Sequence, residues 1–303
     1  MNPRIEILPS DKINQYAWDQ CVRNNSNGLI YTTSVYLNQL SEQWNGLVLN
    51  DYETIMPLPW KKKAGIRYCY TPPFIQQLGI TGGLTMETVK NIFAAITSFV
   101  SYGDFQLNFS NSPLRQIIPA TPRTNLIIDL SSSYEVIRAG YSKDATENIR
   151  KAENKSLLYE KEYRTDGVIL YRELYGNRMP HVKKEDYARF EQLCNQLFAE
   201  KQCFTRTVTH QHEVLSTAIL LTDNKRIYNI MNATTQNGRQ KEANYFLFDQ
   251  LVREFAGSRL LLDFEGSDLS GVRNFYEKFG AVSQPYFFYH LNQLPWPLRF
   301  LTR

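Results

Sequence analysis

Hydrophobic positions recur at two different spacings along this chain, and the change of spacing predicts where helices and strands alternate. The clearest stretch is residues 226–280, where an apolar strand, a polar loop, an amphipathic helix and a second buried strand follow one another. These four elements are predicted at residues 227–231, 232–241, 243–255 and 260–265. A turn at Gly266 and Ser267 then leads into a last helix that stops at Gly280. This order predicts a right-handed crossover, which makes the two strands parallel.

Similar patterns fill the rest of the chain. Before residue 131 they predict strands at residues 6–8, 47–49, 53–58, 67–70, 105–109 and 126–130, and helices at residues 11–22, 35–44 and 86–100. After it they predict helices at residues 134–155, 166–175 and 184–198, and strands at residues 158–164, 204–209, 214–221 and 286–291. We expect Pro57 and Pro59 to place their strand at a sheet edge. Because the element order appears twice, the sequence predicts an α/β protein with two tandem halves, residues 1–140 and 141–303. Each half is predicted to be a mixed, mostly antiparallel sheet flanked by helices.

Composition limits the class of protein. The chain has 303 residues, with 43% hydrophobic and 21% charged residues, as in ordinary globular proteins. A net charge of +4 is too small to indicate DNA binding by itself. No apolar run has the length of a membrane span, and the first residues lack the pattern of a signal peptide. The four cysteines show no CxxC spacing. We therefore expect reduced thiols and a cytoplasmic protein.

Two kinds of site chemistry have little support in the sequence. His210 and His212 bring two imidazoles close together, but no third metal ligand lies nearby in the sequence. No G-x-S-x-G motif marks a serine nucleophile, and Cys194 and Cys203 fall in or beside a predicted helix, as inert thiols do. We expect neither a metal site nor a covalent nucleophile.

The end of the chain resembles a known group of enzymes. Residues 274–281, NFYEKFGA, resemble the "N-x-x-x-Y-E-K-x-G-F" ending of the GNAT N-acyltransferases. Residues 263–267, DFEGS, followed by Phe275, Phe279 and Gly280, resemble the ending of the Fem branch, the aminoacyl transferases of peptidoglycan synthesis. They are more similar still to an uncharacterised bacterial group with "DFEGS…GV…F…FGA". The resemblance implies a GNAT-like fold in each half.

Acid and base residues are predicted near this ending. N-acyl transfer needs a base that deprotonates an ammonium group and an acid that protonates the leaving group. Asp263 and Glu265 alternate along the second buried strand, so we expect them to share a face at its carboxyl end, where ligands collect in α/β sheets. Tyr276 falls where the resemblance places the general-acid tyrosine of GNAT enzymes, whereas Fem enzymes carry lysine there. We predict these three as catalytic residues. The alternatives are that Glu265, Ser267 or Asp268 caps the next helix, and that Tyr276 is a core aromatic.

The loop before the helix at residues 243–255 is a candidate binding site. GNAT enzymes hold the CoA pyrophosphate on backbone N–H groups of a glycine-rich loop at a helix N-terminus. The matching segment here has one glycine, Gly238, and two cations, Arg239 and Lys241, so it departs from the GNAT pattern. We predict these three residues as cofactor-binding through an anion. The alternative is an ordinary polar loop between a strand and a helix.

Three further residues are predicted to bind substrate. Lys143 and Arg150 lie seven apart, on one face of a helix that resembles the "K-x-R-x-x-I-R-K-A" helix of Fem-like proteins. The alternative there is a solvated helix with a Glu147–Lys151 pair. Gln77 lies in a segment that resembles the "P…Q-x-L-G-I" segment of Fem-like first domains, and its alternative is a rigid connection. Residues 61–65, KKKAG, are predicted to be a solvated hairpin tip.

The resemblance and these residues together predict an N-acyltransferase. It transfers an acyl or aminoacyl group from acyl-CoA or aminoacyl-tRNA to an amine, in a small molecule or a cell-wall precursor. Acyl-CoA enters as a co-substrate, and no cofactor is held permanently. The alternative is an inactive GNAT-like binding protein in a cell-envelope or polysaccharide pathway, which the degraded loop supports.

Overall fold

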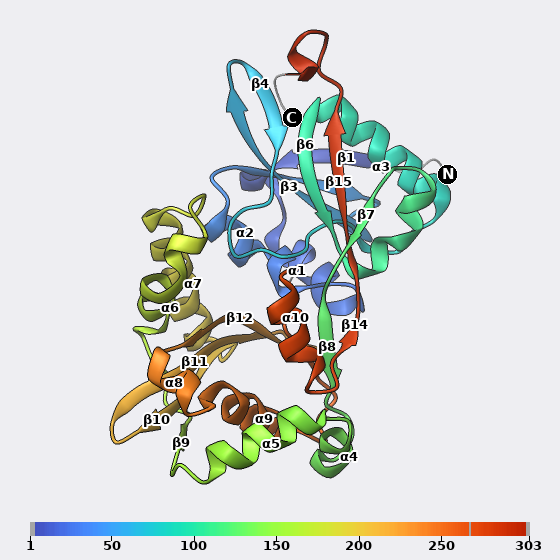
Figure 1. The fold of residues 1–303 in the computed structure, drawn as a ribbon. Coiled ribbons are helices and arrows are strands. Elements are labelled where there is room, and N and C mark those ends of the chain that lie inside the picture. The colour runs from blue at the N-terminus through green and yellow to red at the C-terminus, as the bar shows by residue number, and fades with distance from the viewer. Residues whose placement is uncertain (1–3, 267, 301–303) are drawn as a thin grey trace. The chain divides into compact units, whose positions relative to one another are not determined.

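A computed structural model of the protein describes residues 4–266 and 268–300, and the chain divides into two compact units (Figure 1). Unit 1 takes the chain up to Arg123 and again from Pro285 onward. Unit 2 is Thr124–Gln284. Each unit is a mixed, mostly antiparallel sheet with helices beside it, which confirms the predicted fold class.

Unit 1 is built on a sheet whose strand order, over the described residues, is β1-β2-β3-β4-β6-β15-β7, with β5 paired to β3. Its strands are β1 Ile5–Pro9, β2 Trp44–Leu49, β3 Thr54–Lys63, β4 Ile66–Cys69, β5 Thr81–Gly82, β6 Tyr102–Leu107, β7 Thr121–Arg123 and β15 Tyr286–Asn292. Its helices are α1 Gln15–Asn24, α2 Ser34–Leu40 and α3 Met86–Phe99. Short 3-10 turns are η1 Ser10–Lys12, η2 Ile30–Thr32, η3 Phe109–Gln116 and η5 Leu298–Phe300.

The two prolines of β3 do not make it an edge strand. Pro57 and Pro59 pair with Gly46 and Trp44 of β2. On the other side, β5 pairs only with Thr54 and Ile55, and β4 pairs only with the strand from Trp60 onward. The prolines therefore lie between the β3 residues that pair with β5 and those that pair with β4. No strand pairs with them on that side, so their missing N–H groups are not needed there and an inner strand can contain them.

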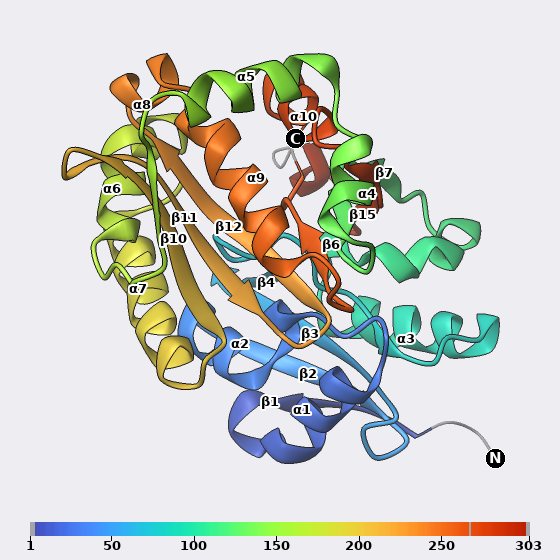
Figure 2. The ribbon, with the colours of Figure 1, turned by 90° about the horizontal axis from the view of Figure 1, so that it is seen from below.

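Unit 2 has a sheet in the order β14-β8-β13-β12-β11-β10-β9 over the described residues. Its strands are β8 Leu126–Asp129, β9 Leu158–Glu160, β10 Cys203–His210, β11 Glu213–Thr222, β12 Arg226–Thr234, β13 Leu261–Asp263 and β14 Val282–Ser283. Its helices are α4 Tyr134–Ala139, α5 Lys143–Glu153, α6 Gly167–Tyr175, α7 Lys184–Ala199, α8 Gln236–Gln240, α9 Ala243–Phe255 and α10 Ser270–Glu277, with a 3-10 turn η4 Gly176–Arg178. Figures 1 and 2 show α5 and α9 on one face of β10–β12, and α6 and α7 on the other.

The core of unit 2 explains why α9 lies where it does. Leu247, Phe248, Leu251 and Val252 share one face of α9 and are fully buried in a cluster with residues of β8, β11 and β13. Burying side chains of this size contributes about 1.5–3 kcal/mol each. The helical spacing that predicted α9 is thus the spacing of its buried face, and the predicted parallel pairing of β12 with β13 is also confirmed.

The division of the chain differs from the predicted one. The predicted boundary after residue 140 lies inside unit 2, because β8 pairs there with β13 and β14. The predicted second half also included residues 286–291, but β15 pairs with β6 and β7 of unit 1. Both differences come from strand pairing between distant parts of the chain. The predicted loop at residues 232–241 is shorter, because β12 continues to Thr234 and α8 follows it.

In unit 1, a sharp bend at Gly79 is held by asparagine side chains. Asn111 accepts a hydrogen bond from the N–H of Ile80 at 2.8 Å and donates to the carbonyl of Ile80 at 3.0 Å. Asn108 donates to the same carbonyl at 2.9 Å. Gly79 has φ +92°, and a Cβ there would lie 2.4 Å from Asn111 Oδ1. The bend therefore requires glycine for its conformation and for space.

We predict that Gly79→Ala destabilises the protein far more than Gly65→Ala. Gly65 has φ +83° but nothing within 4 Å of an added Cβ, so it isolates the conformational cost of about 1–2 kcal/mol. Gly79→Ala adds a steric cost of about 1–3 kcal/mol. Denaturant unfolding of both variants measures the difference. Equal losses would show that the asparagines move aside freely.

Candidate functional site

Strands β12 and β13 part in the middle of the sheet of unit 2. Only the first three residues of β12, Arg226 to Tyr228, pair with β13, because β13 ends at Asp263. From Asn229 onward, β12 has no further ladder partner on that side among the described residues. On its other side, β12 skips one residue against β11, between Asn229 and Met231. We call the opening that begins at Asn229 the fork. Bulges and strand ends of this kind are common beside functional sites, because they re-aim side chains and leave backbone groups open.

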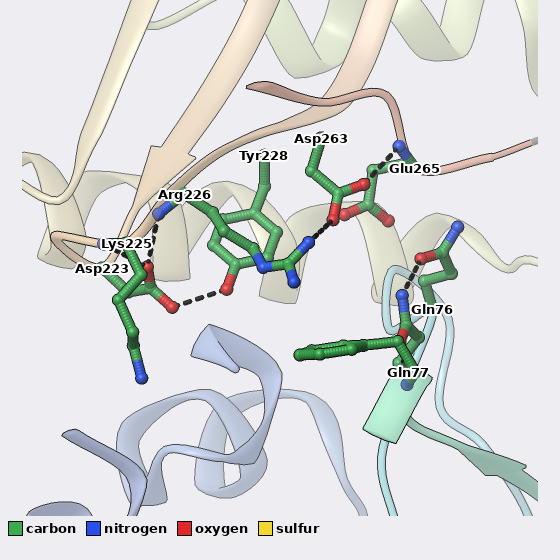
Figure 3. A network of polar contacts seen from close by, with 9 residues as sticks. Gln76, Gln77, Asp223, Lys225, Arg226, Tyr228, Asp263 and Glu265 are labelled. Atoms are coloured by element: carbon green, nitrogen blue, oxygen red, sulfur yellow. Dashed lines mark hydrogen bonds and ion pairs between the residues drawn. The ribbon is translucent and has the colours of Figure 1, made fainter. Parts of the chain in front are cut away.

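A buried ion pair closes the base of the fork. Arg226 Nη1 lies 2.9 Å from Asp263 Oδ2, and the two side chains are 4% and 1% exposed (Figure 3). The other carboxylate oxygen of Asp263 accepts the backbone N–H of Glu265 at 3.0 Å. Burial raises the pKa of Asp263, although the Arg226 guanidinium opposes the shift. Asp263 therefore holds β12, β13 and the chain after β13 together.

Glu265 does not continue the strand alternation that the sequence suggested. Because β13 ends at Asp263 and Glu265 has φ +59°, the two carboxylates do not share one strand face. Glu265 is partly exposed as a residue, but its Oε1 atom is buried and has no hydrogen-bond partner among the described residues. Burial without a partner raises the pKa of Glu265 to about 8. A carboxyl group with such a pKa exchanges protons near neutral pH.

Tyr276 of α10 lies at the fork. Its hydroxyl accepts a hydrogen bond from Asn229 Nδ2 at 3.2 Å, and its ring stacks on Phe264 with centroids 4.2 Å apart. Burial raises the pKa of Tyr276, and the charge of Glu265 raises it further. Glu265 and Tyr276 are therefore within electrostatic range of each other, while Tyr276 is also the buried aromatic that the alternative expected. Ser267, a candidate turn and capping residue, lies outside the described residues.

Sequence reasoning missed three residues near the fork. Asn229 is a buried polar residue in an apolar strand. A polar residue among apolar neighbours is the sequence feature that could have identified it. Tyr171 and Tyr175 of α6 also raise the pKa of Tyr276. The Tyr175 hydroxyl donates to the Thr234 carbonyl at 3.3 Å, so it lies on the last residue of β12. The spacing of Tyr171 and Tyr175 in the sequence predicts only that both lie on one face of a helix. It does not predict that this face lies near the fork.

The predicted anion loop has a structural explanation for its glycine. The Gly238 N–H donates to the Thr235 hydroxyl at 3.0 Å, which caps α8. A Cβ at Gly238 would lie 2.1 Å from the Leu215 carbonyl oxygen, so packing on β11 requires glycine. Arg239 is exposed and donates to the Tyr175 hydroxyl at 3.2 Å, and Lys241 follows α8 before α9 begins. Anion binding by these residues stays a prediction.

The predicted substrate-binding residues lie in different places. Lys143 and Arg150 are exposed on α5, as a binding face or a solvated face requires. The alternative Glu147–Lys151 pair is present at 3.3 Å. Gln77 lies in unit 1, where it is buried, donates to Gln76 at 2.6 Å and accepts the Phe109 N–H at 3.0 Å (Figure 3). These contacts make Gln77 part of a rigid connection, and substrate binding by the three residues stays a prediction.

The described residues were also compared with three other kinds of feature: disulfides, metal sites and membrane-spanning helices. All four cysteines are buried thiols without disulfides. Within residues 4–266 and 268–300, no cluster of three or more His, Cys, Asp or Glu side chains is placed to hold a metal ion. Over the same part of the chain, no helix has the length and apolar character needed to cross a membrane.

Comparison with known proteins identifies the fold. No protein-family model and no curated protein matches the chain. The crystal structure of FemX matches with a TM-score of 0.70 and 13% identity, over 100% of both chains. A tandem GNAT protein from the clavulanic acid biosynthesis pathway matches with a TM-score of 0.55 and 10% identity, over 96% of this chain and 99% of that one. The C-terminal domain of a proposed lysylphosphatidylglycerol synthetase from Agrobacterium fabrum matches with a TM-score of 0.57 and 10% identity, over 95% of this chain and 94% of that one. The chain therefore has the GNAT/Fem-like fold, and the resemblance seen in the sequence is confirmed at the level of the fold.

We predict that Asp263→Asn costs about 3–5 kcal/mol of folding free energy, because it removes the carboxylate that pairs with the buried Arg226. Replacing both partners, as Arg226→Met with Asp263→Asn, is expected to cost less than Asp263→Asn alone. The exposed Arg273–Glu277 pair, at 2.8 Å, is the control, and Glu277→Gln is expected to cost less than about 1 kcal/mol. Denaturant unfolding measures all three. If Asp263→Asn alone lost no more stability than the double variant, another group would be compensating the charge of Arg226.

We predict that Glu265→Gln stabilises the protein increasingly as pH rises. The unfolded carboxyl ionises near pH 4.5 and the folded one near 8, so the folded state loses stability over that window as ionisation is forced on it. Glutamine removes this loss, and the gain rises to about 4–5 kcal/mol at pH 9, falling towards zero near pH 4.

Glu254→Gln is the control of opposite sign for that experiment. Burial acts to raise the pKa of Glu254, but hydrogen bonds from Arg206 and Tyr159 outweigh it and lower the pKa. This variant is therefore expected to lose stability at neutral pH. Unfolding curves from pH 4 to 9 give both differences, and a pH-independent effect of Glu265→Gln would contradict the shift.

Proposed function

We propose, from the GNAT/Fem-like fold of the chain and from the two acid–base groups at the fork, that this protein transfers an acyl or aminoacyl group to an amine. The observation that carries the proposal is the Glu265 carboxyl, whose buried Oε1 has no hydrogen-bond partner among the described residues and whose charge acts on the Tyr276 phenol. Perturbed titratable groups that lie together are typical of catalytic sites.

Glu265 is the proposed base. An amine attacks a carbonyl carbon only after its ammonium form has lost a proton. A carboxyl with a pKa of about 8 is a far stronger base than an ordinary glutamate, and it still ionises near physiological pH. Asp263 supports this role, because its hydrogen bond to the Glu265 N–H fixes the backbone that carries the base.

Tyr276 is the proposed acid. Because burial raises the pKa of its phenol, Tyr276 stays protonated and holds a proton to donate. As the C–N bond forms, the bond between the acyl carbon and the sulfur or oxygen of the donor breaks. The first ammonium proton passes to Glu265 before the attack, and the leaving group takes the tyrosine proton. The second proton that the nitrogen loses as it becomes an amide returns to the tyrosine oxygen. Asn229 donates to the Tyr276 oxygen and thereby stabilises the phenolate that forms.

The donor is a thioester or an ester, since both leave a group that Tyr276 can protonate. Acyl-CoA and aminoacyl-tRNA are the two candidates. The Gly238 N–H is already bonded to Thr235, which supports a donor that is not held by that glycine. The acceptor is an amine in a small molecule or a cell-wall precursor.

Thermal-shift screening with CoA thioesters and with aminoacyl-tRNA tests the donor without knowledge of the acceptor. A ligand at one hundred times its Kd adds about 2.7 kcal/mol of stability. Single-turnover transfer to a panel of amines then tests catalysis. Binding of a donor without transfer to any amine, unchanged by Tyr276→Phe, would favour the inactive binding protein.

We predict that Tyr276→Phe lowers turnover by about 10²- to 10⁴-fold, because a positioned acid contributes that much. Only a hydroxyl is removed, so the loss of stability is about 1 kcal/mol, from the lost bond to Asn229. Tyr134→Phe is the matched control, since it removes a hydroxyl that donates to Asp249 at 2.7 Å and is not at the fork. Turnover and melting temperature are measured together. Normal turnover with a lowered melting temperature for Tyr276→Phe would assign its hydroxyl a structural role only.

A further inference from the structure

One end of the sheet of unit 1 carries exposed side chains that do not pack in the core of the unit. In the sheet, Tyr68 of β4 pairs with Tyr102 of β6, and Tyr102 pairs with Asn292 of β15. The hairpin between β3 and β4 and the loop after β15 therefore leave the sheet at the same end. Figure 1 shows both projecting there. We call them the hairpin tip, residues 62–65, and the C-terminal tip, residues 295–299.

The hairpin tip is basic and exposed. Lys61, just before it, pairs with Glu42 at 2.7 Å, and Arg67, just after it, lies over the rings of Trp60 and Phe99. Lys62 and Lys63 are exposed and have no ion-pair partner among the described residues. Their charges are thus available to a partner of opposite charge.

The C-terminal tip carries an exposed indole. Trp296 is 80% exposed between two prolines, and Leu298 beside it is 37% exposed. The other tryptophans are used inside unit 1, where Trp18 and Trp44 are buried and pack at 5.1 Å. A tryptophan left in water at a projecting loop gives up stabilisation that burial would provide, which marks an interaction site.

Acidic residues are absent from both segments. Residues 60–70 contain three lysines and one arginine, residues 285–300 contain one arginine, and neither segment contains Asp or Glu. Asp104 of β6 lies further along the sheet and pairs with His290 at 2.7 Å. This end of unit 1 is therefore positively charged around an apolar point.

We propose that the hairpin tip and the C-terminal tip dock this protein on an anionic membrane surface. Tryptophan is favoured at the level of lipid headgroups, where its ring is apolar and its N–H is wet. Each lysine near an anionic surface contributes about 1 kcal/mol. Trp296 enters the interface, and Lys62 and Lys63 contact phosphate groups.

The geometry favours a lipid surface over a macromolecular partner. A stable protein interface buries about 800 Å² on each partner, which two narrow tips do not offer. Single-stranded nucleic acid is bound in basic grooves with successive aromatic platforms, whereas here one indole stands among prolines and a leucine. A fluid surface accommodates two projecting tips without a matched shape.

Co-sedimentation with vesicles tests the proposal on the full chain. The probes are vesicles of phosphatidylcholine alone and of phosphatidylcholine with phosphatidylglycerol. We expect binding to the anionic vesicles at least tenfold tighter than to neutral ones, weakened by salt. Trp296→Ala and the pair Lys62→Glu with Lys63→Glu are each expected to weaken it at least tenfold. Tyr16→Ala, at a 73% exposed aromatic of α1, and Lys90→Glu, at an exposed lysine of α3, are matched controls and should leave it unchanged.

Tryptophan fluorescence gives a second readout that does not depend on sedimentation. Trp18 and Trp44 are buried, but Trp60 is only partly buried, so the Trp296→Phe variant assigns the signal. We expect a blue shift on adding anionic vesicles, and Trp296→Phe should abolish it. Equal binding to neutral and anionic vesicles would overturn the proposal, as would full binding by Trp296→Ala. Loss of tRNA binding in the tip variants, with vesicle binding intact, would assign the tips to RNA instead. None of these outcomes depends on acyl transfer.

Discussion

The ion pair between Arg226 and Asp263 is the interaction on which the arrangement of unit 2 depends. It joins the first residue of β12 to the last residue of β13, within the short stretch where the two strands pair. Its two side chains are almost fully buried, and desolvating both charges costs several kcal/mol each. Such a pair is kept where its geometry is needed. Here one carboxylate oxygen holds Arg226 of β12 and the other accepts the Glu265 N–H, so one side chain ties β12 to the chain that follows β13.

Two carboxylates of one short segment differ in their partners. Asp263 has a cation and a backbone N–H, so its lone pairs are used within the fold. Glu265 has a buried oxygen with no partner among the described residues. Burial raises the pKa of both carboxyl groups, but only Asp263 has a cation and hydrogen bonds that oppose the shift.

The sequence predicted the elements of unit 2 well, because their signals are local. The apolar face of α9 and the crossover from β12 to β13 follow from spacing along the chain. The unit boundary did not follow, since β15 pairs with strands far away in the sequence. The positive φ of Glu265 could not be predicted either, because a non-glycine residue adopts it only when tertiary contacts hold it there. The contact between Asn229 and Tyr276 likewise depends on where two separate elements meet.

Gly238 has a structural reason to be glycine that does not involve a ligand. A glycine before a helix in this fold suggests a phosphate loop, but here its N–H caps α8 through Thr235 and its missing Cβ makes room for the Leu215 carbonyl. Both contacts are satisfied by the fold alone, so the glycine is not evidence for a bound phosphate. Any anion at this loop must then be held by side chains such as Arg239 and Lys241, whose charges do not require the backbone to approach closely. Glu265 differs from Gly238 in this respect, because no contact within the described fold satisfies its buried oxygen.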